Sequence, residues 1–261
     1  MIKQTTRDIR RGNRLAVLRH IYAAAPVSRQ MITAASGLSQ ATIANVVSEL
    51  LELGIVVESG YEDSQGGRPR AILAINAANG VFIGVDIAET YIDFELFDLR
   101  LAHQFTIEHT LHAEENQPHQ IVDHVAQGIH ELLDCSGTPR DKVLGVGVSV
   151  PGIVERSGGV SVFAPNWDWH DVPFAALLKQ RIELPIYLDN PLKACAVAEQ
   201  WFGAGREVQH LVMLNLGTGV GAGIIANDAL YRGATNSAGE WGHTAIVLDG
   251  RPCRCGGPRS S

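Results

Sequence analysis

The first fifty residues carry three apolar patterns with helical spacing, separated by Pro26 and by Gly37. Proline ends the first helix, and glycine can adopt the left-handed conformation that a tight turn between the next two helices needs. Ser28 and Ser39 stand where the second and third helices begin, and serine is a favoured N-cap residue. This order predicts a helix-turn-helix. The apolar positions are Leu15, Val17, Leu18, Ile21 and Tyr22, then Met31, Ile32 and Ala35, then Ile43, Val46, Val47, Leu50 and Leu51.

Two strand-like segments, 55–57 and 71–75, follow the third helix and enclose a polar loop, 59–70. Such a hairpin is the wing of a winged helix-turn-helix. The tip of the loop carries Arg68 between Gly67 and Pro69, and a guanidinium on a stiff turn suits a DNA minor groove. The side chains expected to contact DNA are those of Ser28, Arg29, Ser39, Gln40, Ala41, Thr42, Asn45 and Arg68.

Charge divides the chain at the same place. Residues 1–75 have a net charge of +3 and residues 76–261 one of −10, which together give the −7 of the whole chain. Phosphate backbones attract such a basic bias, although charge alone also fits a solvated helix face. Because the basic segment, the third helix and the wing agree, the sequence favours DNA binding over a winged helix that contacts only protein.

Composition excludes several other classes of protein. The share of hydrophobic residues, 46%, and of charged residues, 19%, fits a globular fold rather than a disordered chain. The N-terminal segment lacks the apolar stretch of a signal peptide, and no later apolar run is long enough to span a bilayer. The sequence therefore predicts a cytoplasmic protein with no membrane partner. Of the four cysteines, only Cys253 and Cys255 are spaced like a possible site.

After a polar linker at 76–80, the pattern changes from helices to strands. Segments 81–86, 92–97 and 105–107 predict three strands, 121–133 a covering helix and 144–150 a buried strand. This order is typical of the RNase H-like lobes of sugar kinases and actin. A later hairpin, 211–225, predicts the start of a second lobe. The sequence thus predicts an α/β protein that has a winged helix-turn-helix at 1–75, a first lobe at 81–190 and an incomplete second lobe at 191–261.

Eight short motifs stand in a constant order along the whole chain: 66–69, 86–90, 150–152, 165–167, 189–190, 217–221, 238–243 and 253–256. Together they resemble the ROK family of repressors and sugar kinases, in particular its winged-helix transcriptional regulators. The resemblance implies a sugar-responsive DNA-binding regulator, a repressor of carbohydrate metabolism. It also implies operator DNA, a small sugar or sugar-phosphate effector and a homo-oligomer in the full-length form. The alternative is an ATP-dependent sugar kinase.

Two segments disfavour the kinase alternative. The resemblance places Pro191 where the family's kinases have a catalytic Asp, and proline cannot accept a proton, so no catalytic residue is expected. The resemblance places the family's first phosphate loop, D-x-G-x-T, at residues 86–90. There Ala88 replaces the Gly and so adds a Cβ, and Glu89 adds a negative charge beside a polyphosphate. No ATP is therefore expected, and the loop residues Asp86, Thr90, Gly217, Thr218 and Gly219 are interpreted as vestigial. The Gly-Thr-Gly turn also fits any tight hairpin.

The resemblance assigns sugar binding to five residues: Gly152, Asn166, Asn190, Glu240 and His243. An alternative is that Asn190 and Glu240 cap helices. Two tryptophans in the same region, Trp167 and Trp169, are interpreted as core aromatics.

His243, Cys253 and Cys255 match three ligands of the family's zinc site. A closed structural zinc site has four ligands, and Ser260 stands where the fourth would be. The sequence therefore predicts an incomplete zinc site. Because members of the family continue for another hundred residues or more, we expect a truncated second lobe and a weak response to sugar.

Overall fold

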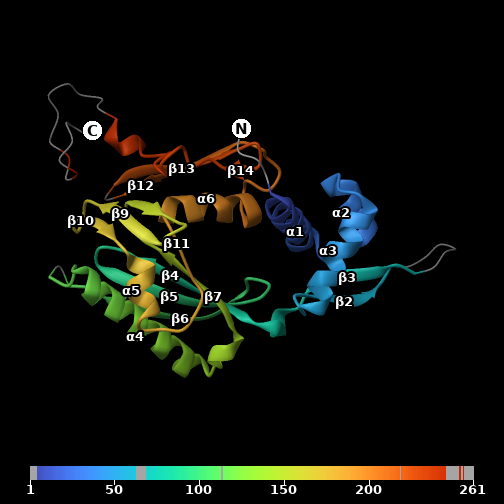
Figure 1. The fold of residues 1–261 in the computed structure, drawn as a ribbon, viewed down its shortest axis with the longest axis horizontal. Helices are drawn as coiled ribbons and strands as arrows, with labels where there is room; N and C mark the ends of the chain where they lie inside the picture. The colour runs from blue at the N-terminus through green and yellow to red at the C-terminus, as the bar shows by residue number, and fades with distance from the viewer. Residues whose placement is uncertain are drawn as a thin grey trace. The chain divides into compact units, whose positions relative to one another are not determined.

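The computed structural model describes residues 5–62, 69–112, 114–217, 219–244, 253 and 255. It divides the chain into two compact units (Figure 1). Unit 1 comprises Met1–Gly80 and Asp98–Ala102, and unit 2 comprises Val81–Phe97 and His103–Ser261. Among the described residues, no helix combines the length and the apolar character that crossing a bilayer requires.

Three helices form the body of unit 1: α1 (Thr6–Ala24), α2 (Arg29–Ser36) and α3 (Gln40–Glu52). Gly37 ends α2 with φ at 68°, and the Ser39 hydroxyl caps α3 by accepting the N–H of Thr42. The predicted helix-turn-helix is confirmed. Two positions predicted to be apolar contacts, Leu15 and Met31, are instead about half exposed. The buried side chains are those of Val17, Ile21, Ile32, Ile43, Val46, Val47 and Leu50.

A three-stranded antiparallel sheet completes unit 1, in the order β1 (Val27–Ser28), β3 (Ala71–Ile75), β2 (Val56–Tyr61). The predicted strand at 71–75 is confirmed, and the one at 55–57 extends to Tyr61. Strand β1 was not predicted, because two residues give no periodicity. The loop tip, including Arg68, lies outside the described residues.

The segment predicted as a linker, 76–80, belongs to unit 1. It contains a 3-10 turn, η1 (Ala77–Asn79). Asn76 donates from Nδ2 to the Gly54 carbonyl at 3.0 Å, and Asn79 donates from Nδ2 to the Leu53 carbonyl at 3.2 Å. These amides satisfy carbonyl groups that the end of α3 leaves open. The linker prediction was therefore wrong: these residues are fixed to the end of a helix.

The turn between β5 (Tyr91–Asp98) and β6 (His103–Thr110) also belongs to unit 1. Asp98 shapes it by accepting the backbone N–H groups of Arg100 and Ala102. The Tyr22 hydroxyl donates to the carbonyl of Leu99, whose side chain is buried. Burial and the nearby Asp98 charge raise the pKa of Tyr22 to about 12. The predicted first-lobe range, 81–190, is therefore interrupted at 98–102.

Unit 2 is built on a five-stranded sheet in the order β11 (Ile186–Asp189), β7 (Val143–Ser149), β4 (Val81–Ile87), β5, β6. β4 and β11 are parallel to β7, whereas β5 and β6 are antiparallel. Along the chain, the predicted order of three strands, a helix and a further strand is present as β4, β5, β6, α4 and β7. Two helices accompany it, α4 (Pro118–Ser136) and α5 (Phe174–Lys179), with the short turn η2 (Arg140–Lys142) before β7. α4 contributes to the core Ile121, Val122, Val125, Ile129 and Leu132.

A second, smaller sheet of unit 2 was not predicted: β8 (Ile153–Glu155), β9 (Val160–Ala164) and β10 (Trp169–Val172). Its strands are three to five residues long, too short to stand out in the sequence. Trp167 and Trp169 are buried at its edge, with ring centroids 4.7 Å apart. The interpretation of this pair as core aromatics is confirmed.

The last part of unit 2 packs α6 (Pro191–Phe202) against the sheet β12 (Leu211–Leu216), β13 (Val220–Ala226) and β14 (Ala229–Leu230). Gly221 and Gly223 permit the close approach, because a Cβ on either would lie 2.3 Å from an atom of Leu192. The predicted hairpin is confirmed. The turn η3 (Trp241–His243) follows it.

Candidate functional site

The N-terminal turn of α3 presents three of the residues predicted to contact DNA. Gln40, Ala41 and Asn45 are exposed. The hydroxyls of Ser39 and Thr42 lie 2.9 Å apart and form the cap of the helix. These two side chains therefore fix the start of α3, while the other three form its open face. Arg68, the predicted wing residue, lies outside the described residues.

A hollow of about 450 Å³ lies beside this face. Arg70 was not predicted, because its place follows from the pairing of β1 with β3, which no local pattern reveals. Arg29 pairs with Glu58 at 3.2 Å, and Arg70 pairs with Glu62 at 3.7 Å. The Ser28 hydroxyl is buried and has no hydrogen-bond partner among the described atoms. The hollow is lined by Ser28, Arg29, Gln30, Thr33, Gln40, Arg70 and Ala71.

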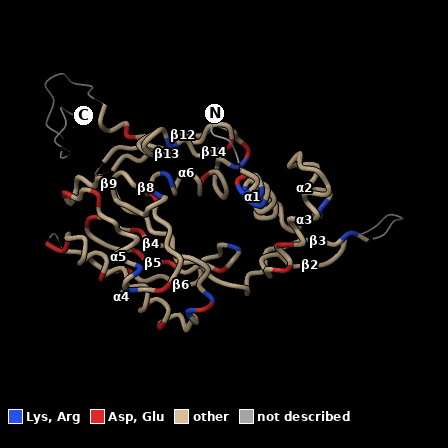
Figure 2. Tube along the Cα trace, in the orientation of Figure 1, with Lys and Arg blue, Asp and Glu red and all other residues tan. Residues whose placement is uncertain are grey.

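α1 carries five of the arginines in the basic N-terminal segment (Figure 2). Arg10 and Arg14 direct their guanidinium groups at Glu49 on α3. These two cations thus join α1 to α3 within unit 1. An ion pair reduces the charge that a phosphate would meet, and this holds for Arg10 and Arg14 as it does for Arg29 and Arg70.

In unit 2, the end of β11 holds a charged cluster around Asp189. Arg232 donates to both carboxylate oxygens of Asp189, at 2.6 and 2.9 Å, and Arg156 lies 3.4 Å away. Lys193, one turn into α6, is almost fully buried. Burial lowers the pKa of its ammonium group, and the charges of Glu240 and Asp189 oppose this effect. The burial of Lys193 could not be predicted, because lysine is almost never fully buried unless it is paired.

Asn190 and Gly152, both predicted to bind sugar, contact each other. Asn190 is buried; its Nδ2 donates to the Gly152 carbonyl at 2.8 Å, and its Oδ1 accepts the N–H of Leu192. The helix-capping alternative for Asn190 is therefore what this geometry shows. One amide hydrogen and one lone pair remain in principle for a ligand. Pro191 is the first residue of α6, a position that suits proline.

Asn166, a third predicted sugar residue, is exposed and contacts the first phosphate loop. Its Nδ2 donates to Oε1 of Glu89 at 2.6 Å. Glu89 is half-buried. The two residues are 77 positions apart, so the sequence contained no signal for this contact.

In both loops interpreted as vestigial phosphate loops, a backbone N–H group donates a hydrogen bond within the turn itself. The N–H of Ala88 donates to the Tyr91 carbonyl at 2.9 Å, and the N–H of Gly217 donates to the Gly219 carbonyl at 3.0 Å. A phosphate site needs such groups to face the ligand. At the end of β4, Asp86 accepts the Ser149 hydroxyl, and Thr90 is exposed. Thr218 lies outside the described residues.

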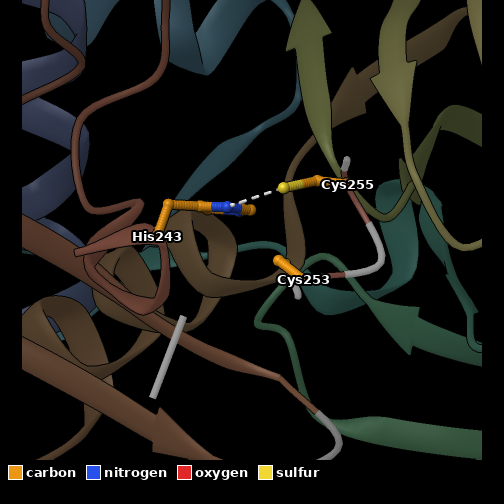
Figure 3. Close-up of side chains that lie close together, drawn as sticks. All are labelled: His243, Cys253 and Cys255. Carbon is orange, nitrogen blue, oxygen red and sulfur yellow. Dashed lines mark hydrogen bonds between the residues drawn. The ribbon is translucent and has the colours of Figure 1, made fainter. Parts of the chain in front are cut away.

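The three predicted metal ligands lie together. Figure 3 shows the imidazole of His243 pointing toward the thiol of Cys255, with Cys253 beside them. His243 Nδ1 and Cys255 Sγ are 3.3 Å apart, and the ligand atoms of all three residues lie within 4.8 Å of one another. Zinc bonds of about 2.0 to 2.3 Å in a tetrahedron fit this spacing. Glu240, the fifth predicted sugar residue, lies 3.8 Å from His243 Nε2.

Known proteins resemble the chain in sequence and in fold. The xylose repressor of Caldicellulosiruptor bescii is 36% identical over 249 residues, which are 94% of this chain and 61% of that protein. The glucokinase of Thermotoga maritima is also 36% identical, but only over 143 residues, 54% of this chain and 44% of that protein. A solved ROK family transcriptional regulator, a homologue of the Escherichia coli MLC protein, shares the fold with a TM-score of 0.80 at 24% identity. It covers 97% of this chain and 63% of that one.

The chain spans 61 to 64% of the lengths of the xylose repressors that it matches. The model of the ROK family matches residues 82–259, which is more than half of the chain. Because this match and the repressor similarity agree, the chain belongs to the ROK family.

Proposed function

We propose that the chain is the DNA-binding and sugar-sensing part of a transcriptional repressor of sugar metabolism. The observation that carries this proposal is unit 1, in which α3 exposes Gln40, Ala41 and Asn45 beside a hollow lined by Arg29 and Arg70. A helix presented in this way can enter a major groove while the cations meet the phosphate backbone. A sugar kinase has no need of such a unit.

The extent of the similarities supports a repressor. The match to the xylose repressor of C. bescii covers nearly all of the chain and thus both units, whereas the match to the T. maritima glucokinase covers about half of it. The C. bescii relative is named a xylose repressor, so xylose is the first effector to test. A sugar that binds one conformation of unit 2 more tightly shifts the population toward that conformation. The affinity for DNA then changes if the two conformations bind DNA with different affinities. A homo-oligomer, implied by the family resemblance, stays a prediction.

Absence of sugar kinase activity is part of the proposal. The family resemblance places Pro191, the first residue of α6, at the position of the catalytic Asp, and both loops engage a backbone N–H in their own turn. We expect no sugar-dependent ATP consumption with xylose, glucose or N-acetylglucosamine in a coupled assay. Turnover that depends on sugar, and that disappears when Asn190 is replaced by Ala, would support the kinase alternative and overturn this part of the proposal.

Zinc binding by His243, Cys253 and Cys255 is a further part of the proposal. When bound, zinc would join His243 in η3 to Cys253 and Cys255. The fourth predicted position, Ser260, lies outside the described residues. The support is the donor set and its spacing, which suit a tetrahedral ion.

Replacing either Cys253 or Cys255 by Ser should weaken zinc binding by roughly 100-fold. Structural sites bind zinc with about 10 to 16 kcal/mol shared among four ligands, so one thiolate contributes several kcal/mol. The measurement is competition with a chromophoric chelator. Cys135→Ser and Cys195→Ser are matched controls, because both thiols lie outside the cluster. Equal zinc affinity in all four variants would show that the cluster does not hold the metal.

A further inference from the structure

Glu89 places a carboxylate beside Asn166, one of the residues predicted to bind sugar. It stands in the loop between β4 and β5, and Oε1 accepts a hydrogen bond of 2.6 Å from Nδ2 of Asn166. A hydrogen bond to an ionised acceptor is about twice as strong as one between neutral groups. The carboxylate therefore fixes the orientation of the Asn166 amide, and through it the groups that a sugar hydroxyl would meet.

The loop that carries Glu89 is negatively charged and disfavours the binding of a phosphate group. Asp86 stands three residues before Glu89. Its charge reaches Tyr91 and Cys195, where burial first and Asp86 second raise the pKa of both groups. The N–H of Ala88 already donates to the Tyr91 carbonyl. A phosphate placed here would meet two carboxylates and would lose a backbone donor that phosphate loops supply.

Three cations of unit 2 interact with carboxylates other than those of Asp86 and Glu89. Arg156 and Arg232 both pair with Asp189, and the charges that favour the ammonium group of Lys193 are those of Glu240 and Asp189. These groups balance one another at the end of β11. They therefore give a phosphorylated ligand little net attraction toward the loop of Glu89.

We propose that Glu89 is a specificity-determining residue of the effector site, which holds Asn166 in place and selects a neutral sugar over its phosphate ester. This inference rests on the sugar-sensing part of the proposed function and extends it by naming the effector class. The loop that resembles a phosphate loop thus acts as a filter against phosphate.

The test is titration of the 261-residue chain with matched pairs of sugars. The pairs are xylose and xylose 5-phosphate, glucose and glucose 6-phosphate, and N-acetylglucosamine and its 6-phosphate. Calorimetry reports binding, and so does the tryptophan fluorescence of the chain, because Trp167 is next to Asn166 in the sequence. We expect the neutral member of at least one pair to bind about 30-fold more tightly or better. Glu89→Gln should shrink this ratio by about 10-fold, because it removes the negative charge and keeps an acceptor for Asn166.

Two further variants separate charge from placement. Glu89→Ala should weaken binding of the neutral sugar about 10-fold. In a chain in which Asn166 is already replaced by Ala, the same substitution should leave the binding of neutral sugar unchanged. Glu183→Gln, which removes an exposed charge of unit 2, is the control and should leave the ratio unchanged.

The outcomes are distinguishable. Two results would overturn the role of Glu89 and leave sugar sensing intact. In the first, the wild-type chain binds sugar, but Glu89→Gln leaves the affinity ratio of neutral sugar to sugar phosphate unchanged. In the second, the wild-type chain prefers the sugar phosphate. Binding of no member of any pair would overturn sugar sensing itself, and this inference with it.

Discussion

Replacing Gly152 by Ala is expected to destabilise unit 2 by about 3 kcal/mol or more. Gly152 has φ at +85°, where a side chain costs about 1 to 2 kcal/mol. The new Cβ would also lie 2.0 Å from the carbonyl oxygen of Phe163 and 2.9 Å from Cα of Ala164, so the backbone must move. That movement would disturb the Gly152 carbonyl, which Asn190 holds at 2.8 Å. Urea unfolding followed by tryptophan fluorescence measures this loss, since all four tryptophans lie in unit 2.

The matched control is Gly137→Ala at the end of α4. Gly137 has φ at +65°, but an added Cβ there would meet nothing within 4 Å. This variant should lose only about 1 kcal/mol, the cost of the backbone conformation alone. Equal losses in the two variants would show that the contact with β9 does not constrain Gly152.

Replacing Asn45 by Ala is expected to reduce the preference of the chain for its DNA sequence by about 5- to 150-fold. A side-chain amide can read a base edge through two hydrogen bonds, which contribute about 1 to 3 kcal/mol of discrimination. Asn45 is exposed on α3, so the substitution leaves the core of unit 1 intact. Fluorescence anisotropy with a specific duplex and a scrambled duplex measures this ratio.

Arg70→Ala should behave differently from Asn45→Ala. Arg70 lines the hollow beside α3, where a cation meets the phosphate backbone whatever the base sequence. The variant should weaken binding to both duplexes alike and lower the dependence on salt by about one phosphate contact. Arg140→Ala, which removes one positive charge from unit 2, is the control. If Asn45→Ala leaves the sequence preference unchanged, α3 is not the recognition helix.

The elements of unit 1 could be predicted because their signals are local. Gly37 ends α2 and Ser39 caps α3, and both effects depend only on residues within one turn. The spacing of the apolar residues in α3 predicts its buried face. The position of Arg70 could not be predicted in this way, because it follows from a two-residue strand, β1, that pairs with β3 more than forty positions later. The turn at 98–102 is similar: Tyr22 contacts Leu99 across 77 positions.

The contacts within the candidate effector site could not be predicted from the sequence. The resemblance assigned Asn166 and Asn190 to sugar binding, and this role stays a prediction. It did not show that Asn190 caps α6 and holds Gly152, nor that Asn166 meets Glu89. These contacts depend on where the small sheet β8–β10 places its loops, and its strands are too short to predict.

Selection of duplex DNA from a random pool by the purified chain shows whether the chain recognises a base sequence. We expect enrichment of one sequence family, bound about 1,000-fold or more tightly than random duplex at physiological salt. We also expect that the Asn45→Ala variant, put through the same selection, loses preference at particular base positions. Recovery of duplexes without any common sequence, or no binding beyond that of an unrelated acidic protein, would contradict the assignment of this chain as a DNA-binding regulator.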